Sequence, residues 1–117
     1  MQILRRTLFT ALLILGWTPA WAGSFLSSTE DMPLAPGLTE LANAGLVFDV
    51  PGGRIIEAYA RGSLRSSDVL RFYATTLPQL GWVRESDLLY SRESERLRLD
   101  LNPQGPTVLV HFTLSPE

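Results

Sequence analysis

The chain lacks two residue types that carry much of protein chemistry. It has no cysteine, which excludes disulfides, a thiol nucleophile, a thiolate metal site and a lipid-bearing cysteine. It also has no lysine, since all ten basic residues are arginine, and this excludes Schiff-base chemistry. A single histidine, His111, leaves no second imidazole to complete a metal site. We therefore expect no metal and no cofactor.

The first 22 residues have the layout of a secretory signal peptide. Arg5 and Arg6 form a positive n-region, residues 8–17 form an apolar run, and Ala20 and Ala22 are the small residues before the cleavage site. The run is short for a membrane span, which needs roughly 20 residues. We expect cleavage after Ala22. The paired arginines leave twin-arginine export open, and an uncleaved N-terminal anchor is the alternative.

The charge that remains after cleavage restricts the partners. Eight arginines and twelve acidic residues give a net charge of −4. Binding of nucleic acid or anionic lipid depends on clustered positive charge, so nucleic acid is excluded as a partner. We expect a periplasmic or secreted protein with no stable membrane anchor after cleavage, and an envelope protein as its partner.

Residues 23–44 are predicted to form a flexible or extended arm. The start of this segment is small, polar and aperiodic, and residues 32–37 contain two prolines. Residues 39–44 fit one helical turn stopped by Gly45.

Two strands follow the arm. The first is predicted at residues 46–50, and a type II turn at Pro51 and Gly52 leads to the second at residues 54–61. Ala58 and Ala60 share one face of the second strand, where small side chains would leave room for a helix.

Residues 66–82 predict the main helix. Apolar residues recur with the helical period from Val69 onward and form a continuous arc centred on Tyr73. Ser66 or Ser67 is the expected N-cap.

The end of this helix carries its own signals. Pro78 should stop or kink the regular helix just before it, and Gly81 should end the last turn in the left-handed conformation. Trp82 then begins the next strand.

After Trp82 the apolar period changes to two, which predicts four short strands. They lie at residues 82–85, 88–92, 96–101 and 107–114. An even loop between the second and third of these strands would turn Leu88 and Tyr90 inward, and an odd loop would turn Leu89 inward. We prefer the even loop, because it buries more apolar surface.

A four-residue loop at residues 102–105 sets the expected register of the last two strands. This loop pairs Leu99 with Val108, Leu97 with Val110, and Arg96 with His111. The apolar side chains of both strands then share one face, as a buried sheet requires.

The predicted element order is β-β-α-β-β-β-β. It indicates an α+β fold, with a mostly antiparallel sheet and one main helix packed on one face. We expect a single monomeric domain over residues 45–115.

His111 is the candidate for general-base chemistry. A base needs a nucleophile and an orienting carboxylate within reach, and Glu57 or Asp100 could supply the carboxylate. The sequence contains no nucleophile motif, so we expect a solvated strand histidine and no catalytic residue.

Two places qualify as a binding surface. Phe72 lies at the rim of the apolar arc of the helix, where an uncovered ring would be a binding anchor. The second place is the outward face of the last two strands, with Arg96, Arg98, Leu109 and His111.

One resemblance rests on the helix and its flanks. Val69, Phe72-Tyr73, Leu77-Pro78 and Gly81-Trp82, together with Gly62-Ser63-Leu64 and the later tyrosine-bearing and Arg-Leu strands, form the pattern. Over roughly residues 46–114 it resembles small exported bacterial domains of unknown function whose helix ends in an "FY…L…GW" pattern. The resemblance implies the fold and a periplasmic location, and it brings no catalytic residues.

The sequence therefore predicts an exported, non-catalytic binding or interaction module. One alternative is a small hydrolase or ligand-processing enzyme that uses His111 with a nearby carboxylate. Another is a domain tethered to the inner membrane by an uncleaved N-terminal helix.

Overall fold

A computed structural model describes residues 24–29 and 31–117. The predicted signal peptide, its cleavage site and the alternative membrane anchor fall outside the described residues, so all three stay predictions. Among the described residues, no helix is long and apolar enough to cross a membrane.

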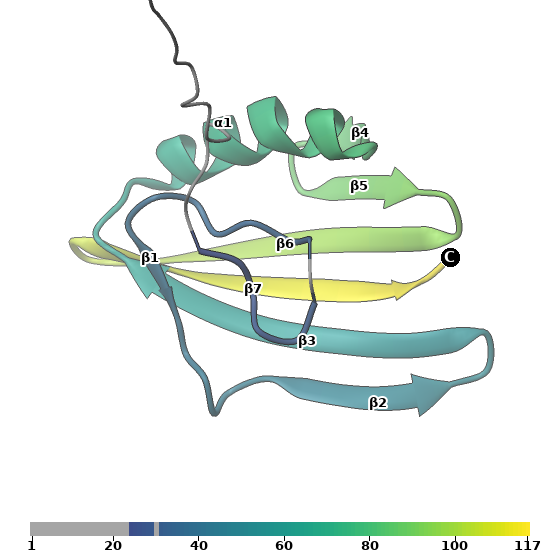
Figure 1. Ribbon diagram of the computed structural model, residues 1–117. Coiled ribbons are helices and arrows are strands. Elements are labelled where there is room, and N and C mark those ends of the chain that lie inside the picture. Colours follow the sequence, from purple (N-terminus) through teal and green to yellow (C-terminus); the bar gives the residue numbers. More distant parts are fainter. Residues whose placement is uncertain (1–23, 30) are drawn as a thin grey trace, which may run out of the picture.

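The predicted α+β class is confirmed: one helix packs on a seven-stranded antiparallel sheet (Figure 1). The strand order is β1-β3-β7-β6-β5-β4, and β2 pairs with the same edge of β3 as β1 does. The elements are β1 (Leu38–Glu40), β2 (Leu46–Val50), β3 (Gly53–Gly62), α1 (Ser66–Thr76), the 3-10 helix η1 (Leu77–Leu80), β4 (Val83–Ser86), β5 (Leu89–Arg92), β6 (Glu95–Gln104) and β7 (Thr107–Pro116).

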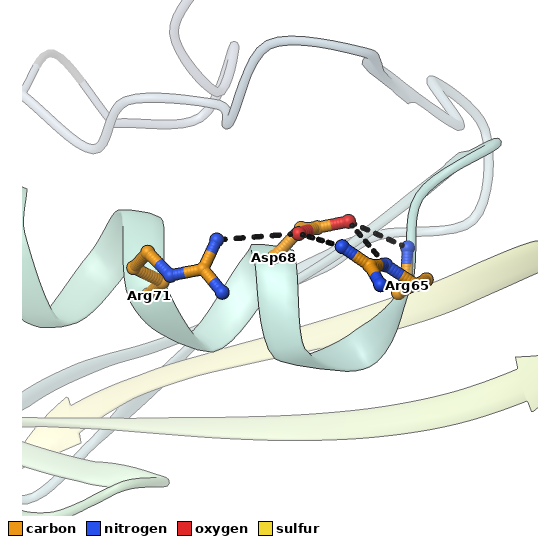
Figure 2. A network of polar contacts seen from close by, with 3 residues as sticks. All are labelled: Arg65, Asp68 and Arg71. Carbon is orange, nitrogen blue, oxygen red and sulfur yellow. Dashed lines mark hydrogen bonds and ion pairs between the residues drawn. The ribbon is translucent and has the colours of Figure 1, made fainter.

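The start of α1 is held by a carboxylate and not by a serine. Arg65 is the N-cap, its N–H donates to Asp68 Oδ2 at 3.3 Å, and its guanidinium contacts both oxygens of the same carboxylate (Figure 2). Arg71 binds Asp68 from the other side, at 3.3 Å. The prediction of Ser66 or Ser67 as N-cap is therefore wrong, because the acidic side chain in the first turn reaches back to the orphan N–H.

The end of the helix follows the sequence signals. The regular helix stops at Thr76, η1 contains Pro78, and Gly81 has a left-handed φ of 92°. Tyr73, at the centre of the predicted arc, is fully buried. Its ring packs edge-on against that of Phe112 on β7, with centroids 5.8 Å apart.

The described part of the N-terminal arm, predicted to be flexible or extended, packs against the core of the domain that was expected to begin at residue 45. Residues 38–40 form strand β1, and the turn predicted within residues 39–44 is confined to residues 41–44, where the Ala44 N–H donates to the Leu41 carbonyl at 3.1 Å. The arm contributes five side chains to the same core as the helix: Leu26, Met32, Leu34, Ala35 and Leu38.

The width of the sheet explains why the arm is buried. Strands lie about 4.8 Å apart, so a row of six strands is roughly 24 Å wide, whereas one helix is only about 10–12 Å across. The Tyr73 hydroxyl ties the arm to the helix: it donates to the Pro33 carbonyl at 2.7 Å and accepts from the Ala35 N–H at 3.3 Å. The arm thus covers apolar sheet surface that the helix leaves open.

The register predicted for the last two strands is wrong by four residues. A two-residue turn at Gly105 and Pro106 replaces the four-residue loop, so Leu101 pairs with Val110 and Asp100 pairs with His111. A slip of four residues keeps every side chain on its predicted face, because the strand period is two. The core face is therefore as expected, and only the partners differ.

The preceding hairpin has the preferred even loop. Arg92 pairs with Glu95 across two residues, and Tyr90 is fully buried. Leu88, expected inward, lies in the turn between β4 and β5 and is exposed.

Candidate functional site

One face of the sheet has no covering element among residues 24–29 and 31–117. The helix and the arm both pack on the face that carries Ala58, Ala60, Leu97, Leu99, Val110 and Phe112. The alternate residues of the three central strands point to the other side. We call this side the outer face, and its central residues are Glu57, Tyr59 and Arg61 of β3, Leu109, His111 and Thr113 of β7, and Arg96, Arg98 and Asp100 of β6.

His111 lies at the centre of the outer face and has partners from a distant part of the chain. Its Nε2 is 3.2 Å from Glu57 Oε1 and 3.5 Å from Thr113 Oγ1. Its ring stacks on that of Tyr59, with centroids 4.3 Å apart and an interplanar angle of 7°. The β3–β7 pairing produces this cluster, because Tyr59 is directly opposite His111 in the register.

The cluster has part of what acid–base chemistry needs. A carboxylate and a hydroxyl both lie within hydrogen-bond reach of the imidazole. However, both face the same nitrogen, Nε2, whereas a nucleophile–base–carboxylate relay uses the two opposite ring nitrogens. The arrangement is thus not a catalytic triad, and it holds the imidazole in one orientation.

Charges of both signs surround the cluster. Asp100 is the cross-strand partner of His111, and Arg98 is the cross-strand partner of Thr113. Arg61, opposite Leu109, donates to Gln104 Oε1 at 3.3 Å. The outer face therefore combines stacked aromatic rings with balanced charge and has no large region of one sign.

The predicted binding residues divide between the two sides of the sheet. His111, Arg98 and Leu109 lie together on the outer face, and Arg96 is two residues further along β6, opposite Ser115. Phe72 is on the helix side, where it is half-buried against the core with its ring edge-on to Tyr73 at 4.9 Å. Phe72 and the other four residues therefore do not form one surface.

Tyr59 was not among the residues that the sequence singled out for a binding surface. The structure places it on the outer face, half-buried under His111. The period-two pattern carried the signal, since Tyr59 shares its parity with Glu57 and Arg61 and not with the buried alanines. The long-range stacking on His111 has no local sequence signal.

A second unusual feature is the edge strand β2. Its apolar side chains are exposed on both faces: Leu46 is 60% exposed, Val47 47% and Phe48 44%. Among the described residues, β2 pairs only with β3, so its other backbone edge is open (Figure 1).

Two hollows lie away from both features. One, of about 490 Å³, lies between the start of α1 and the β6–β7 turn, where Asp68 already occupies the helix N-terminus. The Arg65 hydrogen bonds hold the pKa of Asp68 below its usual value. The other, of about 420 Å³, contains Arg92, which is bound to Asp31 at 2.9 Å. Within the described part of the chain, no group of three or more potential metal-binding side chains occurs.

Comparisons with protein-family models, curated proteins and solved structures give no significant match to this chain. The resemblance to small exported domains with an "FY…L…GW" helix therefore stays a prediction. Any functional assignment must come from the outer face and the β2 edge themselves.

Proposed function

We propose that the protein is an exported, non-catalytic interaction module that binds a protein of the cell envelope through the outer face around His111. The observation that carries this proposal is the Tyr59–His111 stack on a sheet face that no described element covers.

The chemistry of the face supports a binding role over plain solvation. An antiparallel sheet with one buried face usually alternates apolar residues inside with polar residues outside. Here Tyr59, Leu109 and His111 interrupt the polar side, next to charges of both signs. Aromatic side chains and arginines are the residues that most often dominate protein interfaces.

The shape of the face favours a protein partner. Small-molecule sites are concave and bury most of the ligand, whereas the outer face is the side of a regular sheet. Protein interfaces commonly combine an apolar centre with a polar rim. Leu109 and the stacked rings would form that centre, and Arg98 and Asp100 would form the rim.

Site-directed photo-crosslinking in intact cells tests the proposal. A photoreactive residue at Thr113 lies on the outer face, and the same residue at Gln79, exposed on the helix side, is the matched control. Photochemistry suits this protein, because a chain without lysine offers amine reagents only its N-terminus.

We expect a discrete protein adduct from position 113, none from position 79, and loss of the adduct when Arg98→Glu reverses a rim charge. The absence of adducts from both positions would refute binding through the outer face. An adduct from position 113 that persists in the Arg98→Glu variant would refute it as well. Mass spectrometry of the purified protein tests export separately. A chain that begins at Gly23 supports cleavage, and one that begins at Met1 favours the tethered alternative.

A second candidate, hydrolysis that uses His111, is favoured by the 3.2 Å contact between His111 and Glu57. In this case the imidazole would act as the base on a water molecule, with Glu57 orienting the ring. His111→Gln should then abolish turnover of ester and glycoside test substrates. If the wild-type protein turns over none of them, this candidate is withdrawn.

A further inference from the structure

We propose that β2 pairs antiparallel with β2 of a second copy of this chain, so that two sheets join into one across a two-fold axis at Phe48. This inference goes beyond the binding role of the outer face and does not depend on it. It replaces the monomer expected from the sequence with a symmetric dimer.

Among the described residues, the backbone of β2 has unpaired hydrogen-bonding groups along its outer edge. In an antiparallel ladder, residues alternate between hydrogen bonding to one neighbouring strand and to the other. The type II turn closes on Val50 and Gly53, so Val50, Phe48 and Leu46 direct their backbone groups toward β3. Val47 and Asp49 therefore present their N–H and C=O groups at the open edge.

A two-fold axis at Phe48 brings these unpaired backbone groups of the two copies together. When two copies of β2 run antiparallel about Phe48, Val47 of each copy lies opposite Asp49 of the other. These are the two residues with free backbone groups, so each Val47–Asp49 pair exchanges both of its hydrogen bonds. Phe48 then lies opposite Phe48 as a non-hydrogen-bonded pair, in which side chains come closest.

The side chains and charges agree with this register. Phe48 and Leu46, both exposed in one copy, would meet Phe48 and Val50 of the other on the outer-face side. Asp49 would lie beside Val47, so no like charges are directly opposed across the new pair. Within each copy Asp49 also has Arg54 as its cross-strand partner in the hairpin.

The opposite edge of the sheet indicates why the pairing stops at two copies. Strand β4 carries Arg84 and Glu85, and the β4–β5 register shifts between Arg84 and Ser86. Charges and bulges of this kind are how edge strands avoid pairing. Because β4 is protected and β1, on the same side of β3 as β2, is only three residues long, the β2–β2 contact closes into a dimer.

The interface is short, and this sets the expected strength. Stable interfaces usually bury at least about 1,200 Å², and five residues of edge strand offer less. We therefore expect a weak dimer that forms at high protein concentration and dissociates on dilution.

Cysteine trapping tests the register directly, because the chain has no cysteine of its own. Cα atoms of a non-hydrogen-bonded pair are about 4.5 Å apart, which lies within the range of a disulfide, about 4.4–6.8 Å. Phe48→Cys should therefore form a disulfide-linked dimer under mild oxidation. Val83→Cys, at an exposed apolar position on the protected edge, is the matched control.

The protein is expressed from its full sequence and purified as the cells process it. Non-reducing electrophoresis then measures the rate of dimer formation. We expect Phe48→Cys to react at least tenfold faster than Val83→Cys, with both variants retaining the wild-type circular dichroism. Equal rates would mean random collision and would overturn the proposal.

Charge pairing gives a second test that requires a copy of the same chain. Phe48→Lys places two ammonium groups face to face, so this variant should sediment as a monomer, and so should Phe48→Glu. An equimolar mixture of the two should form the dimer again. A mixture that stays monomeric, or wild-type protein that stays monomeric at roughly 0.5 mM, would refute the pairing. Retention of the dimer in Phe48→Lys alone would refute it as well.

Discussion

Removal of the Tyr73 hydroxyl tests how much the contact between the N-terminal arm and the helix contributes to the stability of the domain. Tyr73→Phe removes one oxygen and keeps the ring that packs on Phe112. The Pro33 carbonyl and the Ala35 N–H then lose a partner inside the core, since both residues are buried.

The expected cost follows from these two contacts. A buried polar group left without its partner costs about 1–3 kcal/mol, and the longer Ala35 contact belongs at the low end of this range. Removal of a buried hydroxyl offsets part of the loss, so we expect a net destabilisation of about 2–3 kcal/mol. For a domain of this size, that lowers the melting temperature by at least about 8 °C.

Urea unfolding at pH 7 measures the free energy, and amide hydrogen exchange at Ala35 reports the arm itself. Tyr59→Phe is the matched control: it removes the same oxygen from a half-exposed ring whose hydroxyl has no hydrogen-bond partner among the described residues. We expect Tyr59→Phe to change the stability by less than about 0.5 kcal/mol. If the two variants are equally stable and the Ala35 amide stays protected, the arm does not depend on Tyr73 and the reasoning fails.

High pH gives an independent measurement of the same group. Burial raises the pKa of the Tyr73 hydroxyl above its ordinary value of 10.0. The folded state therefore retains this proton after the unfolded state has released it, so the stabilisation is complete below pH 10 and is lost as the pH rises further. Burial also raises the pKa of Tyr90. Because the chain has no lysine and no cysteine, tyrosines dominate the titration in this range. Tyr73→Phe should lose stability less steeply with pH, and an unchanged slope would contradict the assignment.

Three further predictions follow from local contacts. Gly62→Ala should lower the free energy of unfolding by more than about 3 kcal/mol, because the new Cβ would lie 2.0 Å from the Gly37 carbonyl oxygen. Gly105→Ala is the control: a Cβ there would meet nothing within 4 Å, and the positive φ should cost only about 1–2 kcal/mol. The midpoints of urea unfolding compare the two variants. Asp68→Asn should destabilise the protein at pH 7, because hydrogen bonds from Arg65 lower the pKa of Asp68 in the folded state. The carboxylate therefore gives stability above its unfolded pKa near 3.8, and this stability falls progressively as the pH drops below that value. An effect of Asp68→Asn that does not shrink on acidification would contradict the carboxylate role shown in Figure 2. Arg92→Ala should lower the free energy of unfolding by about 2 kcal/mol, because the guanidinium lies 4.4 Å from the centre of the Trp82 ring and donates to the Leu80 carbonyl. The variant should also shift the Trp82 fluorescence to the red. An unchanged emission would refute the stacking.

Elements with a strong local period were predicted well. The apolar arc around Tyr73, the break near Pro78 and the stop at Gly81 all depend on residues within a few positions of one another. The same holds for β2 and its Pro51–Gly52 turn, which form as the sequence indicates.

Segments whose apolar residues have no regular spacing were not predicted as part of the core. The arm has no regular spacing of its apolar residues, so nothing local marks Leu26 or Met32 as core. Their burial depends on the width of the sheet beneath them, which exists only after the strands have assembled.

The sequence by itself determined the helix, the parity of every long strand and therefore which side chains of β6 and β7 face the core. These properties follow from periods of 3.6 and 2 along the chain. Only the tertiary structure decided the partners: a four-residue slip leaves parity unchanged, so Asp100 replaces Arg96 opposite His111. The β3–β7 pairing likewise brought Glu57 and Tyr59 to His111 and left β2 without a second neighbouring strand in the described part of the chain. Strand neighbours are chosen by packing across the whole sheet, and no local pattern encodes that choice.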